Sequence, residues 1–426
     1  MLLSDLARSL HDDYGLEIDV ITTRHLYRDS AAKLPCGEDW DGIRITRVSA
    51  PNFNRASTAR RLVGNLLFTQ SALLALLSRR RYDVVLTATA PPTIPAVAHL
   101  YHRLTGTPYV YIIYDLEPDR VVTMNVLGSE SRLVRILRGR QRRWLNAAAK
   151  VIPIGRCMQE YLSQNYGVPQ SRMEVIAVGA DADRIVPAAR DTDLRRRFGL
   201  SGLVVLYAGN FGRYHNFNTI LDAAKALMQA GTVVTFALFG NGAQEAFIRA
   251  RIERENIENV KLFPVLPQTE MAELFASADV SLVTLEPNME GLCVPSKFYP
   301  ILASGRPTIA LVGKQCEIAY VLDEADCGVR LGQNDAAALA KSLTHFAQNP
   351  SEAARMGRNA RKVLEEKYSA RHVTRQYHTV LQAASLGRED PGEEGHEKSR
   401  LSFPRGGFSV RHARPPKQTG VTRNTD

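Results

Sequence analysis

The segment that most constrains the fold lies near the middle of the chain. An apolar run at residues 203–208 leads into a turn that holds Gly209 and Gly212. Apolar residues then recur at helical spacing, with Ile220 and Ala224 on one face. In a parallel sheet, a strand, a glycine turn and a helix leave backbone N–H groups at a helix N-terminus, where a phosphate can bind. The position of this unit predicts that a second nucleotide-binding domain begins there.

Strand-like and helix-like patterns alternate over most of the remaining sequence. We expect strands near residues 16–22, 84–87, 109–114, 150–154, 203–208, 234–239, 260–263, 280–284 and 307–311. We expect helices near residues 57–79, 94–104, 130–147, 156–165, 217–229, 243–255, 269–276, 297–304, 316–323 and 351–385. Alternation of this kind predicts α/β domains built on parallel sheets.

The alternation restarts after residue 176, so we expect two Rossmann-like domains. The expected segments are an N-terminal domain at 1–185, a linker at 186–200, a C-terminal nucleotide-binding domain at 201–368, a C-terminal helix at 369–385 and a disordered tail at 386–426. The tail is rich in Gly, Pro and charge and poor in apolar residues. A helical pattern precedes the first strand-like run, so we expect the usual opening strand and its glycine turn to be absent.

Composition favours small anionic or membrane partners over nucleic acid. The 426 residues carry a net charge of +10, which suits nucleotide diphosphates, nucleic acid or an acidic membrane surface. Because only 7% of residues are aromatic and no nucleic-acid-binding motif is present, we expect no nucleic-acid partner. Five scattered cysteines without a CxxC pair fit a reducing cytoplasm and predict neither a disulfide framework nor a zinc site.

Two segments leave a membrane role open. The charge-free run at residues 62–78 is flanked by arginines and is shorter than the roughly 20 residues that span a bilayer. It is either a buried domain helix or a helix lying on an anionic membrane face. The arginine-rich segment 132–143 is likewise either a solvated basic face or a contact with anionic lipid. We expect a cytoplasmic protein, peripheral on the inner face of the cell membrane under the second interpretation.

Several short motifs follow one another in a recognisable order. The stronger ones are YAGNFG at 207–212, LFGNG at 238–242, LFASAD at 274–279 and PSKFYPILASGRP at 295–307; the weaker ones are APP at 90–92, YDLEPD at 114–119 and VGAD at 178–181. Together they resemble family 4 of the retaining glycosyltransferases, which have the GT-B fold. The resemblance covers roughly residues 1–385 and is greatest to the bacterial polysaccharide branch that includes fucosamine and colanic-acid transferases.

The resemblance implies two Rossmann-like domains that face an interdomain cleft. It also implies transfer of a hexose-type sugar, with retention, from a UDP- or GDP-linked donor to a glycan or polyprenyl-diphosphate-linked acceptor in surface-polysaccharide assembly. In such enzymes the departing diphosphate assists the incoming hydroxyl, and the protein stabilises charge without a covalent nucleophile. We expect no cofactor and no metal. The alternatives are a degenerate or truncated nucleotide-binding relative without activity, or a sugar-nucleotide epimerase.

Four glycines are candidate donor-binding residues. Gly209 and Gly212 would let bare backbone approach the donor's diphosphate. Gly240 and Gly242 end another strand, where a loop would face the same cleft. The alternative for each pair is a tight turn that binds no ligand.

The motif at residues 295–307 supplies further candidates. In the family, the loop of Pro295 and Ser296 and the helix start near Tyr299 hold the nucleotide sugar. Ser296 is a candidate cap for this helix, and Lys297 is a candidate phosphate partner or an ordinary surface lysine. Earlier in the chain, Val265 and Leu266 occupy positions that grip the nucleobase in the family, or pack on the core.

The chain departs from the family pattern at its charged positions. Pro300 replaces the second glutamate of the usual E-x7-E pair. Glu290 matches the first and either reaches the donor sugar or is a solvated loop carboxylate. Asn210 and His215 stand where the family has Arg and Lys. We expect Arg213, which lies between them, to be the replacement cation, with His215 either a ligand or a structural hydrogen-bonding residue.

Two more carboxylates are candidates. Glu317 either accepts a hydroxyl of the donor sugar or caps its own helix. Asp115 follows an apolar strand and either accepts a hydroxyl proton and orients the acceptor or caps a helix, with Asp119 as a weaker substitute. The expected catalytic set is therefore Asp115, Arg213, Lys297 and Glu290.

Overall fold

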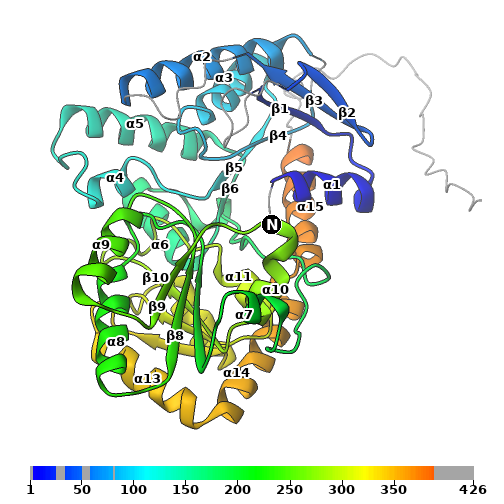
Figure 1. The fold of residues 1–426 in the computed structure, drawn as a ribbon. Helices are drawn as coiled ribbons and strands as arrows, with labels where there is room; N and C mark the ends of the chain where they lie inside the picture. Colours follow the sequence, from blue (N-terminus) through cyan, green and yellow to red (C-terminus); the bar gives the residue numbers. More distant parts are fainter. Residues whose placement is uncertain (1–2, 25–33, 50–57, 80–81, 388–426) are drawn as a thin grey trace, which may run out of the picture. The chain divides into compact units, whose positions relative to one another are not determined.

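The computed structural model describes residues 3–24, 34–49, 58–79 and 82–387. Helices and strands alternate along the chain, as Figure 1 shows. The longer helices are α1 (Leu3–Tyr14), α2 (Thr58–Leu77), α3 (Pro95–Thr105), α5 (Arg132–Ala147), α6 (Arg156–Tyr166), α8 (Phe217–Gln229), α9 (Glu245–Glu255), α12 (Glu317–Ala325), α13 (Ala336–Gln348), α14 (Pro350–Val363) and α15 (Ala370–Leu386). The short ones are α4 (Asp119–Thr123), α7 (Asp193–Arg197), α10 (Met271–Ala276) and α11 (Phe298–Ala303).

The first half of the chain contains two three-stranded sheets. One consists of β1 (Asp19–Thr23), β3 (Ile43–Val48) and β2 (Gly37–Trp40), with β1 parallel and β2 antiparallel to β3. The other consists of the parallel strands β4 (Val85–Thr87), β5 (Tyr109–Ile113) and β6 (Lys150–Pro153). β2 and β3 were not predicted, because GEDW has one apolar residue and the apolar residues of IRITRV are interrupted by two arginines and a threonine.

The second half contains one parallel sheet of six strands. Its order is β12-β11-β10-β7-β8-β9, and its strands are β7 (Leu203–Ala208), β8 (Val234–Phe239), β9 (Val260–Phe263), β10 (Val280–Thr284), β11 (Thr308–Leu311) and β12 (Gly328–Leu331). Read from β9, this is the Rossmann order 3-2-1-4-5-6. Strands β7, β8 and β10 are buried over nearly their whole length, as expected for a parallel sheet covered on both faces.

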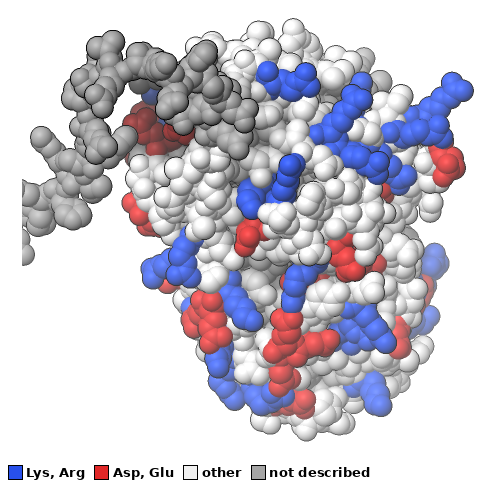
Figure 2. Space-filling model, turned by 180° about the vertical axis from the view of Figure 1, so that it is seen from behind, with Lys and Arg blue, Asp and Glu red and all other residues white. Residues whose placement is uncertain are grey.

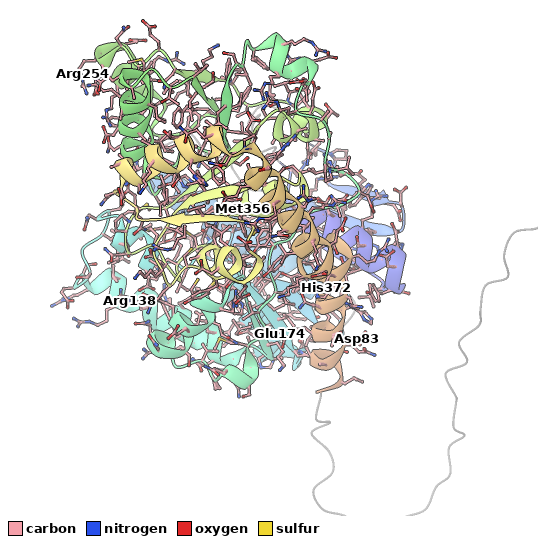
Figure 3. All side chains as sticks on the ribbon, turned by 90° about the horizontal axis from the view of Figure 1, so that it is seen from below. Asp83, Arg138, Glu174, Arg254, Met356 and His372 are labelled. Carbon is pink, nitrogen blue, oxygen red and sulfur yellow. The ribbon has the colours of Figure 1, made fainter. Side chains whose placement is uncertain are left out.

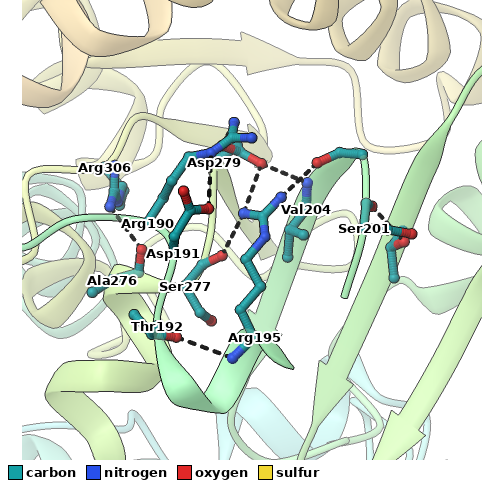
Figure 4. Close-up of polar contacts among 12 residues, drawn as sticks. Arg190, Asp191, Thr192, Arg195, Ser201, Val204, Ala276, Ser277, Asp279 and Arg306 are labelled. Atoms are coloured by element: carbon teal, nitrogen blue, oxygen red, sulfur yellow. Dashed lines mark hydrogen bonds and ion pairs between the residues drawn. The ribbon is translucent and has the colours of Figure 1, made fainter. Parts of the chain in front are cut away.

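The segment expected as a linker is firmly attached to this sheet (Figure 4). The guanidinium of Arg195 donates to the carboxylate of Asp279 at 3.3 Å and to the carbonyl of Ser277 at 3.1 Å. The other oxygen of Asp279 accepts from Arg190 at 2.9 Å, and the backbone amide of Val204 also donates to Asp279, at 2.8 Å. The aspartate that ends the LFASAD motif therefore orders the entry into β7.

The C-terminal helix α15 returns to the first half of the chain. It packs against α1 and β5, and the ring of Tyr14 stacks on that of His378 with centroids 4.2 Å apart. A backbone bridge between Ala180 and Ser369 marks the start of this return. Figure 3 shows Glu174 beside His372 on α15; both line a hollow of about 390 Å³ with Lys150 and Arg375.

Candidate functional site

The strand order of the second sheet defines one position for a ligand. β7 and β10 are neighbours, and the chain proceeds from them toward opposite edges of the sheet. In open α/β sheets, ligands bind outside the carboxyl ends of the strands where the order reverses. The loops that follow β7 and β10 meet there, because the amide of Glu286 donates to the carbonyl of Tyr214 at 2.8 Å.

Two carbonyl groups of the glycine turn after β7 accept hydrogen bonds from one side chain. The side-chain amide of Gln244 donates to the carbonyls of Gly212 at 2.6 Å and His215 at 2.8 Å. The Gly209 amide donates to the carbonyl of Phe239 at 2.9 Å, so it is not available to a phosphate. Within the described part of the chain, the N–H groups of Asn210, Gly212, Arg213 and Tyr214 have no acceptor. These amides remain for an anion.

The second pair of glycines is explained by packing. A Cβ atom at Gly240 would lie 1.9 Å from the carbonyl oxygen of Gly209. A Cβ at Gly242, whose φ is 152°, would lie 2.4 Å from the side-chain oxygen of Asn210. The turns after β7 and β8 therefore touch backbone to backbone, and glycine is required at both positions whether or not a ligand binds. The exposed Asn210 contributes its side chain to this contact.

Lys297 reaches across from the β10 side to the end of β7. Its ammonium donates to the hydroxyl of Tyr207 at 2.5 Å and lies 3.7 Å from the centroid of that ring. It also lies 3.4 Å from the Cβ position of Gly209. Among the described residues no carboxylate is paired with Lys297. Desolvation lowers the pKa of Lys297 to about 7, so an anion bound here would restore the full charge.

The two residues expected to replace the family's cations behave differently. His215 is buried, and its Nδ1 donates to the carbonyl of Thr284 at 2.7 Å. Burial, together with the charge of Lys297, lowers the pKa of His215 to about 3, so the imidazole is neutral and supplies no positive charge to a phosphate. Arg213 is exposed, and its side chain contacts no polar partner within the described residues. The cation that the fold holds against the turn is Lys297.

The loop before α11 differs from the expectation in two respects. Ser296 is exposed and does not cap the helix; the residue before the helix is Lys297, and no side chain caps it. Pro295 is buried, and its carbonyl accepts the amide of Phe298 at 3.1 Å. Tyr299 is fully buried, and its ring packs on that of Tyr368 with centroids 5.4 Å apart.

Glu290 is half-buried and is held by hydrogen bonds. One of its carboxylate oxygens accepts the amide of Gly313 at 3.1 Å and the side-chain amide of Gln333 at 3.0 Å. A Cβ at Gly313 would lie 2.2 Å from that oxygen, so glycine is needed for this approach. These contacts fix Glu290 near the carboxyl ends of β10, β11 and β12.

Asp115 is brought to the same loops from the first half of the chain. It forms an isolated backbone bridge with Cys293, and the amide of the next residue, Leu116, donates to the carbonyl of Leu292 at 2.9 Å. Arg120 lies 4.0 Å from the Asp115 carboxylate and 5.6 Å from the ring centroid of Tyr214. Burial raises the pKa of Asp115 while Arg120 opposes that shift. A carboxylate of raised pKa beside the Glu290–Lys297 loop is suited to accept or orient a hydroxyl group.

The carboxylates of Glu317 and Asp119 form hydrogen bonds and ion pairs with other protein groups. Both oxygens of Glu317 bind Arg156, one at 2.6 Å from its backbone amide. Glu317 therefore caps the N-terminus of α6 rather than its own helix, and its side chain is buried. Asp119 is also buried, and accepts from Arg138 at 2.8 Å and from the hydroxyls of two tyrosines, Tyr161 and Tyr166.

Val265 and Leu266 are the residues expected to contact a nucleobase. Val265 is exposed and Leu266 packs partly against the core, and their role toward a base stays a prediction.

Tyr207, Gln244 and Arg120 were not singled out from the sequence. Tyr207 lies within the YAGNFG motif, where its neighbours suggested only a buried strand.

Comparison with known families agrees with this geometry. Residues 3–179 match the model of the glycosyl transferase 4-like domain, and residues 193–363 match that of glycosyl transferases group 1. The chain is a glycosyltransferase with these two domains. This glycosyltransferase is 29% identical over 292 residues to the probable glycosyltransferase WbjE of Pseudomonas aeruginosa, covering 68% of this chain and 72% of that protein. It is 24% identical over 327 residues to the putative colanic acid biosynthesis glycosyl transferase WcaI of Escherichia coli, covering 72% and 78%.

Solved structures show the same fold. The glycosyltransferase superimposes on sucrose-phosphate synthase from Thermosynechococcus elongatus with a TM-score of 0.70 and 17% identity, covering 89% of this chain and 92% of that one. It superimposes on HepE of Anabaena, solved with UDP-glucose, with a TM-score of 0.63 and 16% identity, covering 80% and 86%. The fold is GT-B.

Proposed function

We propose that this glycosyltransferase moves a hexose-type sugar from a UDP- or GDP-linked donor to a glycan or lipid-linked acceptor in bacterial surface-polysaccharide assembly. The similarity to a colanic acid biosynthesis transferase supports the pathway class, and the fold shared with HepE, which binds UDP-glucose, supports the donor class. The observation that carries the proposal is the position of Lys297, a cation without a carboxylate partner in the described chain, beside the turn after β7.

The proposed chemistry is electrostatic. As the sugar leaves, negative charge develops on the donor's diphosphate, and Lys297 with the amides of Gly212 and Arg213 would stabilise it. Glu290, held by its contact to Gly313, would accept a hydroxyl of the donor sugar. Asp115 would orient the acceptor hydroxyl from the opposite half of the chain. Retention follows if the departing phosphate, rather than a protein nucleophile, assists that hydroxyl on the same face. In this scheme neither a metal nor another cofactor takes part.

Calorimetry tests the donor half of this proposal. Titration of the full chain with UDP-glucose, other UDP-sugars and GDP-mannose should give saturable binding for at least one donor, in the presence and absence of EDTA. Absence of binding to every donor would reject the proposed function. If a donor binds, NMR of the transfer product reports the anomeric configuration, and conversion of the donor without any acceptor would instead support an epimerase.

A further inference from the structure

The exposed apolar side chains of this protein are concentrated on three helices. Sixteen large apolar residues are exposed in the described part of the chain, and nine of them lie on α2, α3 and α5. α3 packs against both α2 and α5, so the three helices form one layer (Figure 1). We call their solvent-facing side the α2–α3–α5 face. Exposed apolar side chains gathered on adjacent helices in this way indicate an interaction site.

Helix α2 contributes the most apolar part of this face. Its exposed side chains include Val63, Leu66, Leu67, Leu74 and Leu77, with exposed fractions from 40% to 60%. Their spacing places them on one side of the helix, while Ala72 and Leu76 face the core. Helix α2 is therefore both a core helix and a surface with an uncovered aliphatic stripe. Among the described residues, no helix is long and apolar enough to cross a membrane.

Helices α3 and α5 combine apolar residues with positive charge. Leu100 and Leu104 are exposed on α3, and Leu133 and Ile136 on α5. On α5 they alternate with arginines, of which Arg132, Arg135, Arg140 and Arg143 are exposed and have no hydrogen-bond or ion-pair partner among the described residues. Figure 2 shows blue side chains projecting from the upper right, where α5 lies when Figure 1 is turned round.

The charge of this layer has one sign. The sequences of α2, α3 and α5 contain no aspartate or glutamate; Glu130, just ahead of α5, is an exposed acidic neighbour. Unpaired arginines beside exposed leucines fit a surface that offers both anionic headgroups and a hydrocarbon boundary. A soluble protein partner would supply acidic side chains but rarely such a large apolar area at a highly charged face.

We propose that the α2–α3–α5 face docks on an anionic lipid bilayer. The face is also connected to the candidate site, because Arg138 of α5 binds Asp119, which lies four residues beyond Asp115. Docking would therefore hold Asp115 near the membrane surface, where the membrane would carry a lipid-linked acceptor. The docking itself requires neither donor nor acceptor, so it can be tested separately from the proposed transfer reaction.

Vesicle sedimentation with the full chain tests the proposal. The protein should sediment with phosphatidylcholine vesicles that contain phosphatidylglycerol, and much less with phosphatidylcholine alone. Replacing Arg132, Arg135, Arg140 and Arg143 by Gln should reduce binding by roughly several hundredfold, since each arginine near such a surface contributes about fivefold. A matched variant with Arg196, Arg249, Arg254 and Arg358 replaced by Gln changes the net charge equally and should bind like the parent.

A second variant tests the apolar component. Leu66→Gln with Leu74→Gln should weaken vesicle binding at high salt, where the arginine contribution is screened, and circular dichroism checks that both variants fold. Three results would overturn the proposal: no preference of the parent for anionic vesicles, equal loss in the matched arginine variant, or a dimer of the parent that the leucine variant converts to monomer. The last would assign the face to a second copy of the chain.

Discussion

The ammonium of Lys297 lies 2.5 Å from the hydroxyl of Tyr207 and 3.7 Å from the centroid of its ring. The same hydroxyl donates to the carbonyl of Asn210 at 2.9 Å. Tyr207 therefore connects a cation from the β10 side to the glycine turn after β7. The cation held against this turn is Lys297, since Asn210 is uncharged and the lowered pKa of His215 leaves its ring neutral.

Replacing Lys297 tests whether its ammonium binds the donor's diphosphate. We expect Lys297→Ala to weaken binding of a UDP- or GDP-sugar at least tenfold, because a charged hydrogen bond to phosphate is lost. Lys341→Ala, an exposed lysine on α13, is the matched control and should leave the affinity unchanged. Calorimetry at pH 6.5 measures both. Equal donor affinity in the Lys297→Ala variant and the parent would remove Lys297 from the site.

Tyr207→Phe tests whether the tyrosine hydroxyl positions Lys297, because the substitution leaves the charge of the site unchanged. The variant keeps the ring beneath the ammonium but removes the hydroxyl that Lys297 and the Asn210 carbonyl share. We expect donor affinity to fall by roughly three- to tenfold and stability by about 1 kcal/mol, the net contribution of one hydrogen bond. Calorimetry and urea unfolding report the two effects. Loss of stability with unchanged donor affinity would make Tyr207 a purely structural residue.

The pKa of Lys297 predicts a pH dependence of binding. Because desolvation lowers this pKa to about 7, the lysine is charged below pH 7 and progressively neutral above it. Donor affinity should therefore be flat at low pH and fall as pH rises through 7, by up to about tenfold per unit. The diphosphate of a nucleotide sugar stays fully ionised over this range, so the donor does not obscure the effect. In Lys297→Arg the cation stays charged, and the profile should flatten.

The same shift has the opposite effect on folding. The unfolded chain holds the Lys297 proton up to its ordinary pKa of 10.5, whereas the folded chain releases it near 7. Between these values the unfolded state binds more protons, so this lysine makes stability increase as pH rises. Urea unfolding between pH 7 and 9 should show a smaller increase for Lys297→Met than for the parent. Identical slopes in the two proteins would contradict the lowered pKa.

The sequence predicted the fully buried strands of the fold better than the partly exposed ones. The strands β7, β8, β10 and β11 are mostly apolar and buried, so they are visible in the sequence as runs. β2 and β3 pair with each other through charged, partly exposed strands that lack such a signal. In the site, residues within one motif were identifiable, but partners far apart in sequence were not. Gln244 binds two carbonyls of the glycine turn, and only the tertiary structure brings them together.

Carboxylates gave the least reliable sequence interpretation. Glu290, Glu317, Asp115 and Asp119 all follow strands or begin helices, so sequence position alone did not separate them. Burial and partners do: Glu317 and Asp119 are saturated by arginine and tyrosine groups, whereas Asp115 keeps a partly exposed carboxylate with Arg120 at 4.0 Å. A residue's competing contacts are a property of the folded chain.

Glu317→Gln distinguishes the structural role of this carboxylate from sugar binding. The change weakens the contact to Arg156, whose side chain is 40% exposed, so we expect a loss of about 1–3 kcal/mol of stability. Donor affinity should stay within twofold of the parent. Glu324→Gln is the control, since Glu324 binds the same arginine at the surface and should cost less than 1 kcal/mol. A large loss of donor affinity at unchanged stability would show that Glu317 contacts the donor.

Gly240→Ala tests the contact between the two turns. The added Cβ would lie 1.9 Å from the carbonyl oxygen of Gly209 and 3.0 Å from the ring of Phe211. Since backbone atoms cannot move aside cheaply, we expect a loss of about 1–3 kcal/mol or more, with weaker donor binding because the glycine turn shifts. Gly139→Ala on α5 is the contrasting change: no atom lies within 4 Å of its Cβ position, and alanine should stabilise this helix by about 0.5–1 kcal/mol. Urea unfolding of both variants measures the difference, and similar effects of the two substitutions would mean that the turns are not in backbone contact.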